Sequence, residues 1–343
     1  MVTQNLYRPK SLNEIVGQDE VREYLRIKVS AAKNSGAPIG HTLFLGSSGA
    51  GKTTFAHAVA LEMGVDCVEL FAPTIPSKDI LIQTLAKLKP NSIVFVDEIH
   101  ALSPKVQEVL YTALEDGEIH GINKFTKAQY IIKVPPFTMI GATTHEGRLN
   151  EPLRKRFPNA VRLRPYNLAE MTKIIVSAAK NQFQILLDEN TAKRIACVSQ
   201  GTPRVARNLL KAAYEVAQAY NSDVSIAVVN KTLLFEELDP IIGLNRAQRR
   251  YLMALATEGQ MGAKGLAVLL DEQVETIEFA IEPFLMQEVE LPHPDNNTQY
   301  ESGIMVKRTT KGRQITPFGL RYLQVCAKLQ QHGWLQGESL TVN

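Results

Sequence analysis

Residues 46–53 carry the pattern with the clearest chemistry in the chain. They read Gly-Ser-Ser-Gly-Ala-Gly-Lys-Thr and match the phosphate-binding pattern G-x-x-x-x-G-K-[ST] at every fixed position. The glycines let backbone N–H groups surround phosphate oxygens, and the N-terminus of a following helix favours negative charge. In such loops the lysine reaches the β- and γ-phosphates and the hydroxyl ligates Mg²⁺. We therefore expect a nucleotide and Mg²⁺ to be held by Gly49, Ala50, Gly51, Lys52, Thr53 and Thr54.

Two adjacent acids, Asp97 and Glu98, follow the apolar run Ile93-Val94-Phe95-Val96. If this run is a strand of a parallel sheet, both acids lie at its carboxyl end, where such sheets bind ligands. We expect Asp97 to hold Mg²⁺ through water and Glu98 to orient and deprotonate an attacking water. Two such carboxylates suit hydrolysis better than transfer to a small molecule. The alternative is an acidic turn without a chemical role.

The surrounding elements predict an α/β P-loop core followed by two smaller parts. Three continuous apolar segments, 42–45, 92–96 and 137–142, alternate with helical patterns, which predicts a parallel sheet covered on both faces. The next part is helical throughout, and Asp239-Pro240 interrupts its pattern. The predicted domains are a nucleotide-binding core at 1–165, an all-helical domain at 166–240 and a C-terminal domain at 241–343.

The C-terminal part has the pattern of a winged helix, although a generic small helical domain is the alternative. Three helical segments, with a tight turn between the second and third, precede β-like pieces. A basic run then suggests a wing tip that contacts backbone phosphates without reading bases. A solvated charged face is the other interpretation of this run. The candidate DNA contacts are Lys307, Arg308, Lys311 and Arg313.

Composition excludes several classes of protein. Of the 343 residues, 45% are hydrophobic and 21% charged, which excludes a disordered chain. No run of 18 apolar residues predicts a transmembrane helix, and residues 1–6 contain no apolar core of a signal peptide. Cys67, Cys197 and Cys326 lie far apart, so neither a disulfide framework nor a zinc ribbon is expected. We predict a cytoplasmic protein that does not contact membranes.

Four short segments occur in the order found in AAA+ ATPases. They are Asp97-Glu98-Ile99-His100, Gly141-Ala142-Thr143-Thr144, Leu153-Arg154-Lys155-Arg156-Phe157 and Gly201-Thr202-Pro203-Arg204. Three more segments narrow the likeness, so that nearly the whole chain resembles the RuvB family of Holliday-junction branch-migration motors. These are Tyr7-Arg8-Pro9-Lys10-Ser11-Leu12, the stretch from Glu275 to Leu285, and Arg308-Thr309-Thr310-Lys311-Gly312-Arg313.

The resemblance implies an ATP-driven homo-hexamer that moves double-stranded DNA at four-way junctions. Thr144 would be the sensor-1 residue and Arg204 the sensor-2 residue, while Arg156 would be an arginine finger offered to the neighbouring subunit. The nucleotide pocket would be lined by Tyr7, Arg8, Arg154 and Tyr166. The segment 117–134 matches in position the hairpin through which the family docks its junction-binding partner RuvA.

The chain also departs from the family pattern. Ser47 and Ser48 stand where the family usually carries prolines, and His145 stands where it often has an arginine. The residues of 117–134 differ from the usual ones, and residues 293–303 appear as extra residues of the wing.

Two other functions remain open at the level of sequence. One is a clamp-loader-like AAA+ ATPase that loads or remodels a protein on DNA, although its usual four-cysteine zinc module cannot form here. The other is an ATP switch that binds specific DNA. Its recognition helix would need base-reading side chains, whereas residues 274–287 offer mainly Glu275, Glu278 and Glu282, which phosphates repel.

Overall fold

The computed structural model describes residues 9–122, 128–293 and 296–331. Tyr7 and Arg8, and the tip of the predicted partner hairpin, therefore lie outside the described residues. The chain divides into two compact units. The first comprises the chain up to Ile174 together with Thr202–Arg204, and the second comprises Ile175–Gly201 and the chain from Val205 onward. Each unit is described by itself.

The first unit is built on a parallel sheet of five strands in the order β2-β3-β6-β1-β7. The strands are β1 (Thr42–Leu45), β2 (Cys67–Phe71), β3 (Ile93–Asp97), β6 (Thr138–Thr143) and β7 (Asn159–Arg162). The three apolar segments predicted as strands are confirmed as β1, β3 and β6. These three are neighbours, so their carboxyl ends, and the motifs that follow them, meet at one edge of the sheet.

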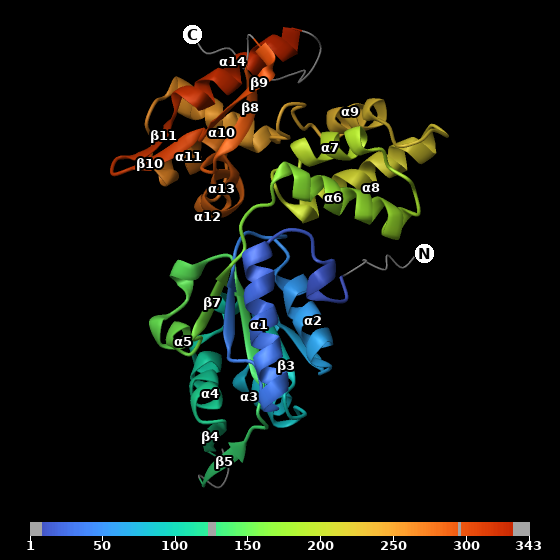
Figure 1. Ribbon diagram of the computed structural model, residues 1–343. Helices are drawn as coiled ribbons and strands as arrows, with labels where there is room; N and C mark the ends of the chain where they lie inside the picture. Colours follow the sequence, from blue (N-terminus) through green and yellow to red (C-terminus); the bar gives the residue numbers. More distant parts are fainter. Residues whose placement is uncertain (1–8, 123–127, 294–295, 332–343) are drawn as a thin grey trace. The chain divides into compact units, whose positions relative to one another are not determined.

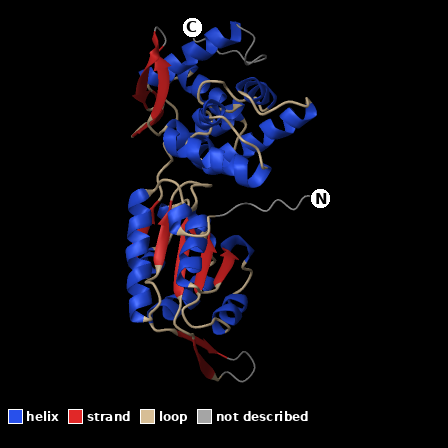
Figure 2. Cartoon of the chain, turned by 45° about the vertical axis from the view of Figure 1, so that its right-hand side comes forward, coloured by secondary structure: helices blue, strands red, loops and turns tan. Residues whose placement is uncertain are grey.

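Helices cover both faces of this sheet, because successive strand residues point to opposite sides (Figures 1 and 2). In β1, Leu43 and Leu45 join one core and Phe44 joins the other. The face with Phe44 packs against α1 (Asp19–Ser35) and α2 (Lys52–Met63). The opposite face packs against α3 (Lys78–Ala86), α4 (Pro104–Glu115) and α5 (Glu151–Lys155).

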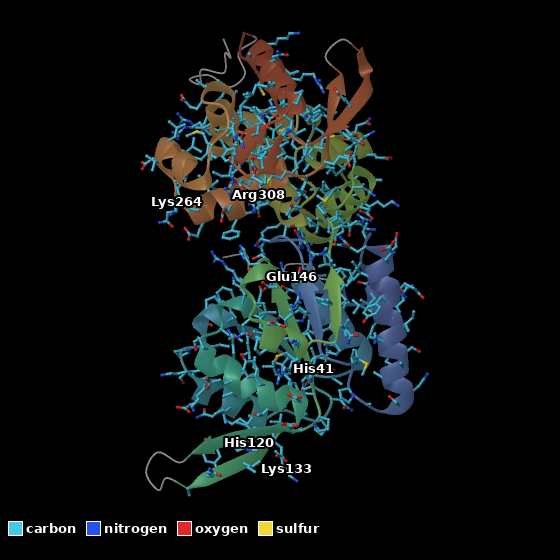
Figure 3. All side chains as sticks on the ribbon, turned by 90° about the vertical axis from the view of Figure 1, so that its left-hand side faces the viewer. His41, His120, Lys133, Glu146, Lys264 and Arg308 are labelled. Carbon is cyan, nitrogen blue, oxygen red and sulfur yellow. The ribbon has the colours of Figure 1, made fainter. Side chains whose placement is uncertain are left out.

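A separate antiparallel hairpin follows α4 and projects from the sheet domain (Figure 1). Its strands are β4 (Glu118–Ile122) and β5 (Gln129–Lys133), and Figure 3 labels one residue on each, His120 and Lys133. Ile119 anchors the hairpin in the core, whereas Ile131 is 57% exposed. The described residues of 117–134 therefore form a hairpin with an apolar residue on its surface.

The second unit begins with helices. Most of its lid is formed by α7 (Glu189–Cys197), α8 (Pro203–Ala219) and α9 (Ile226–Phe235), which follow α6 (Leu168–Ala178) and the π-helical turn Ala179–Phe183. Each of these three helices buries apolar residues completely: Ala192 and Ile195 on α7, Leu210 on α8 and Leu233 on α9. Within the described residues, no helix combines the length and apolar character needed to cross a membrane.

The rest of the second unit is a winged helix around one core. Its helices are α10 (Arg246–Thr257), α11 (Ala263–Leu270), the turn-interrupted helix formed by α12 (Val274–Thr276), Ile277–Ile281 and α13 (Glu282–Leu285), and α14 (Pro317–Gln331). The wing is the hairpin of β10 (Val306–Thr309) and β11 (Gly312–Ile315). Met261, which precedes α11, forms an isolated antiparallel bridge with Arg313 of β11.

The extra residues predicted in the wing form a hairpin of their own. β8 (Val289–His293) pairs with β9 (Asn296–Gly303), and Met305 N donates to Leu285 O at 3.1 Å, which closes the base of the insertion. The placement of residues 293–303 in the wing was therefore wrong. Alternating β-like residues show that strands exist, but not which strands pair.

Candidate functional site

The phosphate loop connects β1 to α2 in a conformation that requires its glycines. Gly46, Gly49 and Gly51 have φ values of 152°, 81° and 105°, which other residues rarely adopt. A Cβ on Gly49 would lie 2.7 Å from the Cβ of Arg204. Because Gly51 occupies the N-cap position of α2 without a side chain, the first N–H groups of the helix can face an anion.

Lys52 lies at the start of α2 with 6% of its surface exposed. Its Nζ donates to Gly46 O at 2.8 Å and to Ser47 O at 3.0 Å. Burial lowers the pKa of this amine, while the nearby carboxylates Glu98 and Asp97 oppose the shift. Lys52 is therefore already directed into the loop where phosphate oxygens would be bound, and Thr53 and Thr54, both half-buried, follow it.

The two acids occupy the end of β3. Asp97 Oδ1 accepts a hydrogen bond from Glu98 N at 3.0 Å, and burial raises the pKa of the Asp97 carboxyl. Glu98 has a left-handed backbone with φ 49°, a conformation that costs a non-glycine residue about 1–3 kcal/mol. This turn directs the Glu98 carboxylate toward the end of β6, where the Thr144 hydroxyl donates to Glu98 Oε2 at 3.0 Å.

Two histidines complete this edge of the sheet. His100 Nδ1 lies 2.8 Å from Thr143 Oγ1 and 3.2 Å from Glu98 Oε2. His145 Nδ1 lies 2.6 Å from Thr144 Oγ1, and the two imidazole rings meet edge to face with centroids 4.8 Å apart. Burial lowers the pKa of both histidines. Both rings are therefore mainly neutral at pH 7.

Sequence reasoning had not given these two histidines a role in the site. They are 45 positions apart in the numbering, and their proximity arises because β3 and β6 are neighbours. Their positions directly after two motifs, three residues beyond Asp97 and one beyond Thr144, were the available signal.

Arg204 and Tyr166 contact the phosphate loop from later parts of the chain. Arg204 Nη1 donates to Ser48 Oγ at 2.8 Å, so a serine that departs from the family pattern supplies the acceptor. Tyr166 OH donates to Ala50 O at 3.2 Å, and burial raises the pKa of this phenol to about 12. Arg204 and Tyr166, both predicted from sequence to lie at the nucleotide, therefore contact residues of the phosphate loop.

Arg154 and Arg156 are held by other partners in this chain. Arg156 Nη2 donates to Glu115 Oε2 at 2.7 Å, and its guanidinium lies over the Tyr111 ring at 5.1 Å. Arg154 is exposed, with its Nη1 3.8 Å from Glu146 Oε1. These partners belong to neither the phosphate loop nor the Asp97-Glu98 pair.

The predicted DNA contacts of the wing divide into two kinds. Arg313 is only 13% exposed, and it binds Glu282 at 2.8 Å through Nε and Glu278 at 2.6 Å through Nη2. Arg308 (labelled in Figure 3) also binds the buried Glu282, through Nη2 at 2.7 Å, but its side chain is 56% exposed. Lys307 and Lys311, in contrast, are exposed.

These ion pairs change the interpretation of the candidate recognition helix. Glu278 and Glu282 do not present free negative charge to DNA, because Arg308 and Arg313 neutralise them, and Tyr251 OH also donates to Glu282 Oε1 at 2.9 Å. The argument that phosphates repel these two acids was therefore wrong. It treated the acids and the arginines as separate surfaces.

Comparison with known proteins shows what the chain resembles. Residues 7–163 match the Holliday junction DNA helicase RuvB P-loop domain, residues 166–239 the RuvB AAA lid domain, and residues 241–290 the RuvB C-terminal winged helix domain. The chain belongs to the RuvB family. Its three RuvB-type parts confirm the predicted fold class of P-loop core, helical lid and winged helix.

Solved RuvB structures agree over almost the whole chain. The Thermotoga maritima RuvB Holliday junction branch migration motor is 31% identical, with a TM-score of 0.78, and the match covers 92% of this chain and 98% of that one. A substituted variant of the same RuvB gives 31% identity and a TM-score of 0.80, covering 93% and 99%. The winged-helix match ends at residue 290, within β8 of the extra hairpin.

Proposed function

We propose that this RuvB-family protein is an ATP-driven motor that translocates double-stranded DNA and so moves the branch point of Holliday junctions. It would act as a homo-hexameric ring in the cytoplasm. The convergence of Lys52, Glu98 and Thr144 at the carboxyl ends of adjacent strands carries this proposal. Because the lid and winged helix also match RuvB models, the clamp-loader-like alternative is not favoured.

The residues of the loop fit Mg²⁺-ATP. A Cβ at Gly49 would occupy space between the phosphate loop and Arg204, and Lys52 is buried with its amine directed into the loop. Thr53 and Asp97 would hold Mg²⁺, which supplies positive charge against the phosphates when bound. Lys52 and Arg204 would bind phosphate oxygens. Tyr7, Arg8, Arg154 and Tyr166 would line the rest of the pocket.

Glu98 is the proposed base for hydrolysis. Its carboxylate would accept a proton as water attacks the γ-phosphorus, and ADP and phosphate would leave. The Thr144 hydroxyl donates to this carboxylate. Thr144 would therefore lie beside both the base and the γ-phosphate, where it could act as the sensor-1 residue.

Ring assembly is proposed from the surroundings of Arg156. Its guanidinium is partly exposed beside Glu115, and it contacts no residue of the phosphate loop described above. An arginine finger acts across an interface by stabilising charge on the transferred phosphoryl group. We infer that Arg156 leaves Glu115 when a neighbouring subunit presents its ATP.

DNA and partner contacts are proposed on two surfaces. Lys307 and Lys311 on the wing are exposed and suited to backbone phosphates, with Arg308 as a further contact. The β4–β5 hairpin, with Ile131 and Tyr130 exposed, is proposed as the contact for a RuvA-like junction-binding protein. Both assignments extend what RuvB relatives do to residues of this chain.

A junction assay tests the proposal. The full-length protein, supplied with a RuvA-type protein, ATP and Mg²⁺, should dissociate a synthetic four-way junction with long homologous arms. Glu98→Gln should bind ATP but hydrolyse it about 10²-fold or more slowly and leave the junction intact. The control Glu23→Gln, at an exposed position of α1, should behave as wild type. Hydrolysis stimulated by a sliding clamp but not by junctions would refute the proposal.

A further inference from the structure

Glu98, His100 and His145 bring one carboxylate and two imidazoles to one place. One ligand atom from each residue lies within 4.8 Å of the other two, and this is the single such group of three among the residues the structure describes. Glu98 Oε2 and His100 Nδ1 are already 3.2 Å apart. All three side chains are partly buried at the edge of the sheet, beside the proposed hydrolysis site.

The ligand types and spacing match those of a borderline metal ion. Zn²⁺ binds imidazole nitrogen and carboxylate oxygen at about 2.0–2.2 Å, often with three protein ligands and one open position. Ligand atoms at that distance in a tetrahedral site lie about 3.4 Å apart. The ligand atoms of the cluster lie within 4.8 Å of one another, so the largest separation exceeds this spacing by about 1.4 Å. Mg²⁺ prefers all-oxygen ligands, so the site differs from that of Thr53 and Asp97.

Each of the two rings makes a hydrogen bond through its Nδ1. The Thr143 hydroxyl lies 2.8 Å from His100, and the Thr144 hydroxyl lies 2.6 Å from His145. In metal sites the ring nitrogen that does not bind the ion makes such a bond, so a histidine that keeps its threonine bond at Nδ1 would bind the ion through Nε2. Neighbouring strands β3 and β6 hold the backbones of both segments. The cluster therefore has positioned ligands and supporting groups.

His145 is a member of the cluster that the proposed hydrolysis does not use. An arginine at this position would remove the site, because a guanidinium has no acceptor atom for a metal and repels a dication. The other two members, Glu98 and His100, follow the β3 strand directly. Substitution of His145 therefore tests metal binding and leaves the proposed base Glu98 in place.

We propose that Glu98, His100 and His145 bind Zn²⁺ or a similar transition-metal dication, and that this ion inhibits ATP hydrolysis. The bound ion occupies the Glu98 carboxylate, which can then no longer accept a proton from the attacking water. ATP binding through Lys52 and the loop glycines is unaffected. The inhibitory part rests on the proposed role of Glu98, whereas the metal site itself does not.

Co²⁺ binding tests the site without any ATPase measurement. Full-length protein is stripped with a chelator, returned to Mg²⁺ buffer without nucleotide, and titrated with Co²⁺ while its visible absorption is recorded. Wild type should show an absorption band that Zn²⁺ abolishes, and His145→Gln should bind this Co²⁺ at least about tenfold more weakly. His145→Arg provides a second variant. The control His120→Gln, in the β4–β5 hairpin, should titrate as wild type.

The outcomes separate the two parts of the proposal. If both His145 variants give the wild-type Co²⁺ titration, the metal site is refuted. If the variants lose Co²⁺ but Zn²⁺ inhibits their ATPase as strongly as that of wild type, the inhibitory role is refuted and the site stands. Each rate is compared with that of the same protein without Zn²⁺. An inactive metal-free wild type would instead count against the proposed function and leave the binding result intact.

Discussion

Arg313→Ala should destabilise the winged helix more than it weakens DNA contact. Arg313 is 13% exposed, and its guanidinium binds Glu282, whose side chain is 1% exposed, and Glu278. Removing one partner of a buried ion pair costs about 3–5 kcal/mol, because the other charge stays buried. Tyr251 and Arg308 still bind Glu282 in the variant, so we expect the lower end, about 3 kcal/mol.

Hydrogen exchange can measure this loss in the full-length chain. A change of about 3 kcal/mol raises the opening equilibrium about 10²-fold, since each 1.4 kcal/mol is tenfold. Amides of α12, α13 and the wing should therefore exchange about 10² times faster in Arg313→Ala. Amides of the five-stranded sheet, which belongs to the other unit, provide the internal control.

Lys311→Ala is the matched variant on the same wing. Lys311 is exposed, so exchange should not change, but duplex DNA binding should weaken alike across sequences. The slope of log K against log salt should fall by about one unit. If Arg313→Ala keeps wild-type exchange and loses DNA affinity as Lys311→Ala does, then Arg313 is a DNA contact and our reasoning about Glu282 fails.

Three further predictions concern the first unit. Gly49→Ala should weaken binding of a fluorescent ATP analogue at least about tenfold, because φ is 81° and the new Cβ would overlap the Cβ of Arg204. Arg156→Ala should hydrolyse ATP about 10³-fold more slowly, yet mixing it with inactive Glu98→Gln should restore hydrolysis; a mixture that exchanges subunits and stays inactive argues against a finger in trans. The hydrogen bond from Arg164 lowers the pKa of Glu170. The pair therefore stabilises the fold fully above the ordinary glutamate pKa, and this contribution is lost as the pH falls through the lowered pKa of Glu170. Glu170→Gln should flatten that acid-side decline in urea unfolding, and an unchanged pH profile would contradict the assignment.

The parts of the fold that were predictable are those encoded locally. The phosphate loop is one continuous pattern, and β1, β3 and β6 are buried on both faces, so they read as unbroken apolar runs. The edge strands β2 and β7 were not predicted. Cys67–Phe71 is only partly buried, and Val161 alone is buried in β7, so neither segment has a distinctive pattern.

The parts that were missed depend on which elements become neighbours. The contact of His100 with His145 requires β3 to lie beside β6, which no local pattern reveals. The pairing of Arg313 with Glu282 likewise requires the wing to fold back on α13. Charged residues can be counted in a sequence, but whether two of them cancel is decided by tertiary structure.

The bond between Leu285 and Met305 also bears on how easily this domain can be enlarged. The chain leaves the winged helix after residue 285 and returns to the same place at residue 305, so the β8–β9 segment is a closed loop. The entropy cost of closing a loop rises with the logarithm of its length, about 0.6 kcal/mol per doubling. Buried Leu291 offsets part of that cost. A reporter peptide inserted in this loop away from β8, whose Val289 and Leu291 pack in the winged-helix core, should therefore leave the winged helix folded and provide an attachment point for labels.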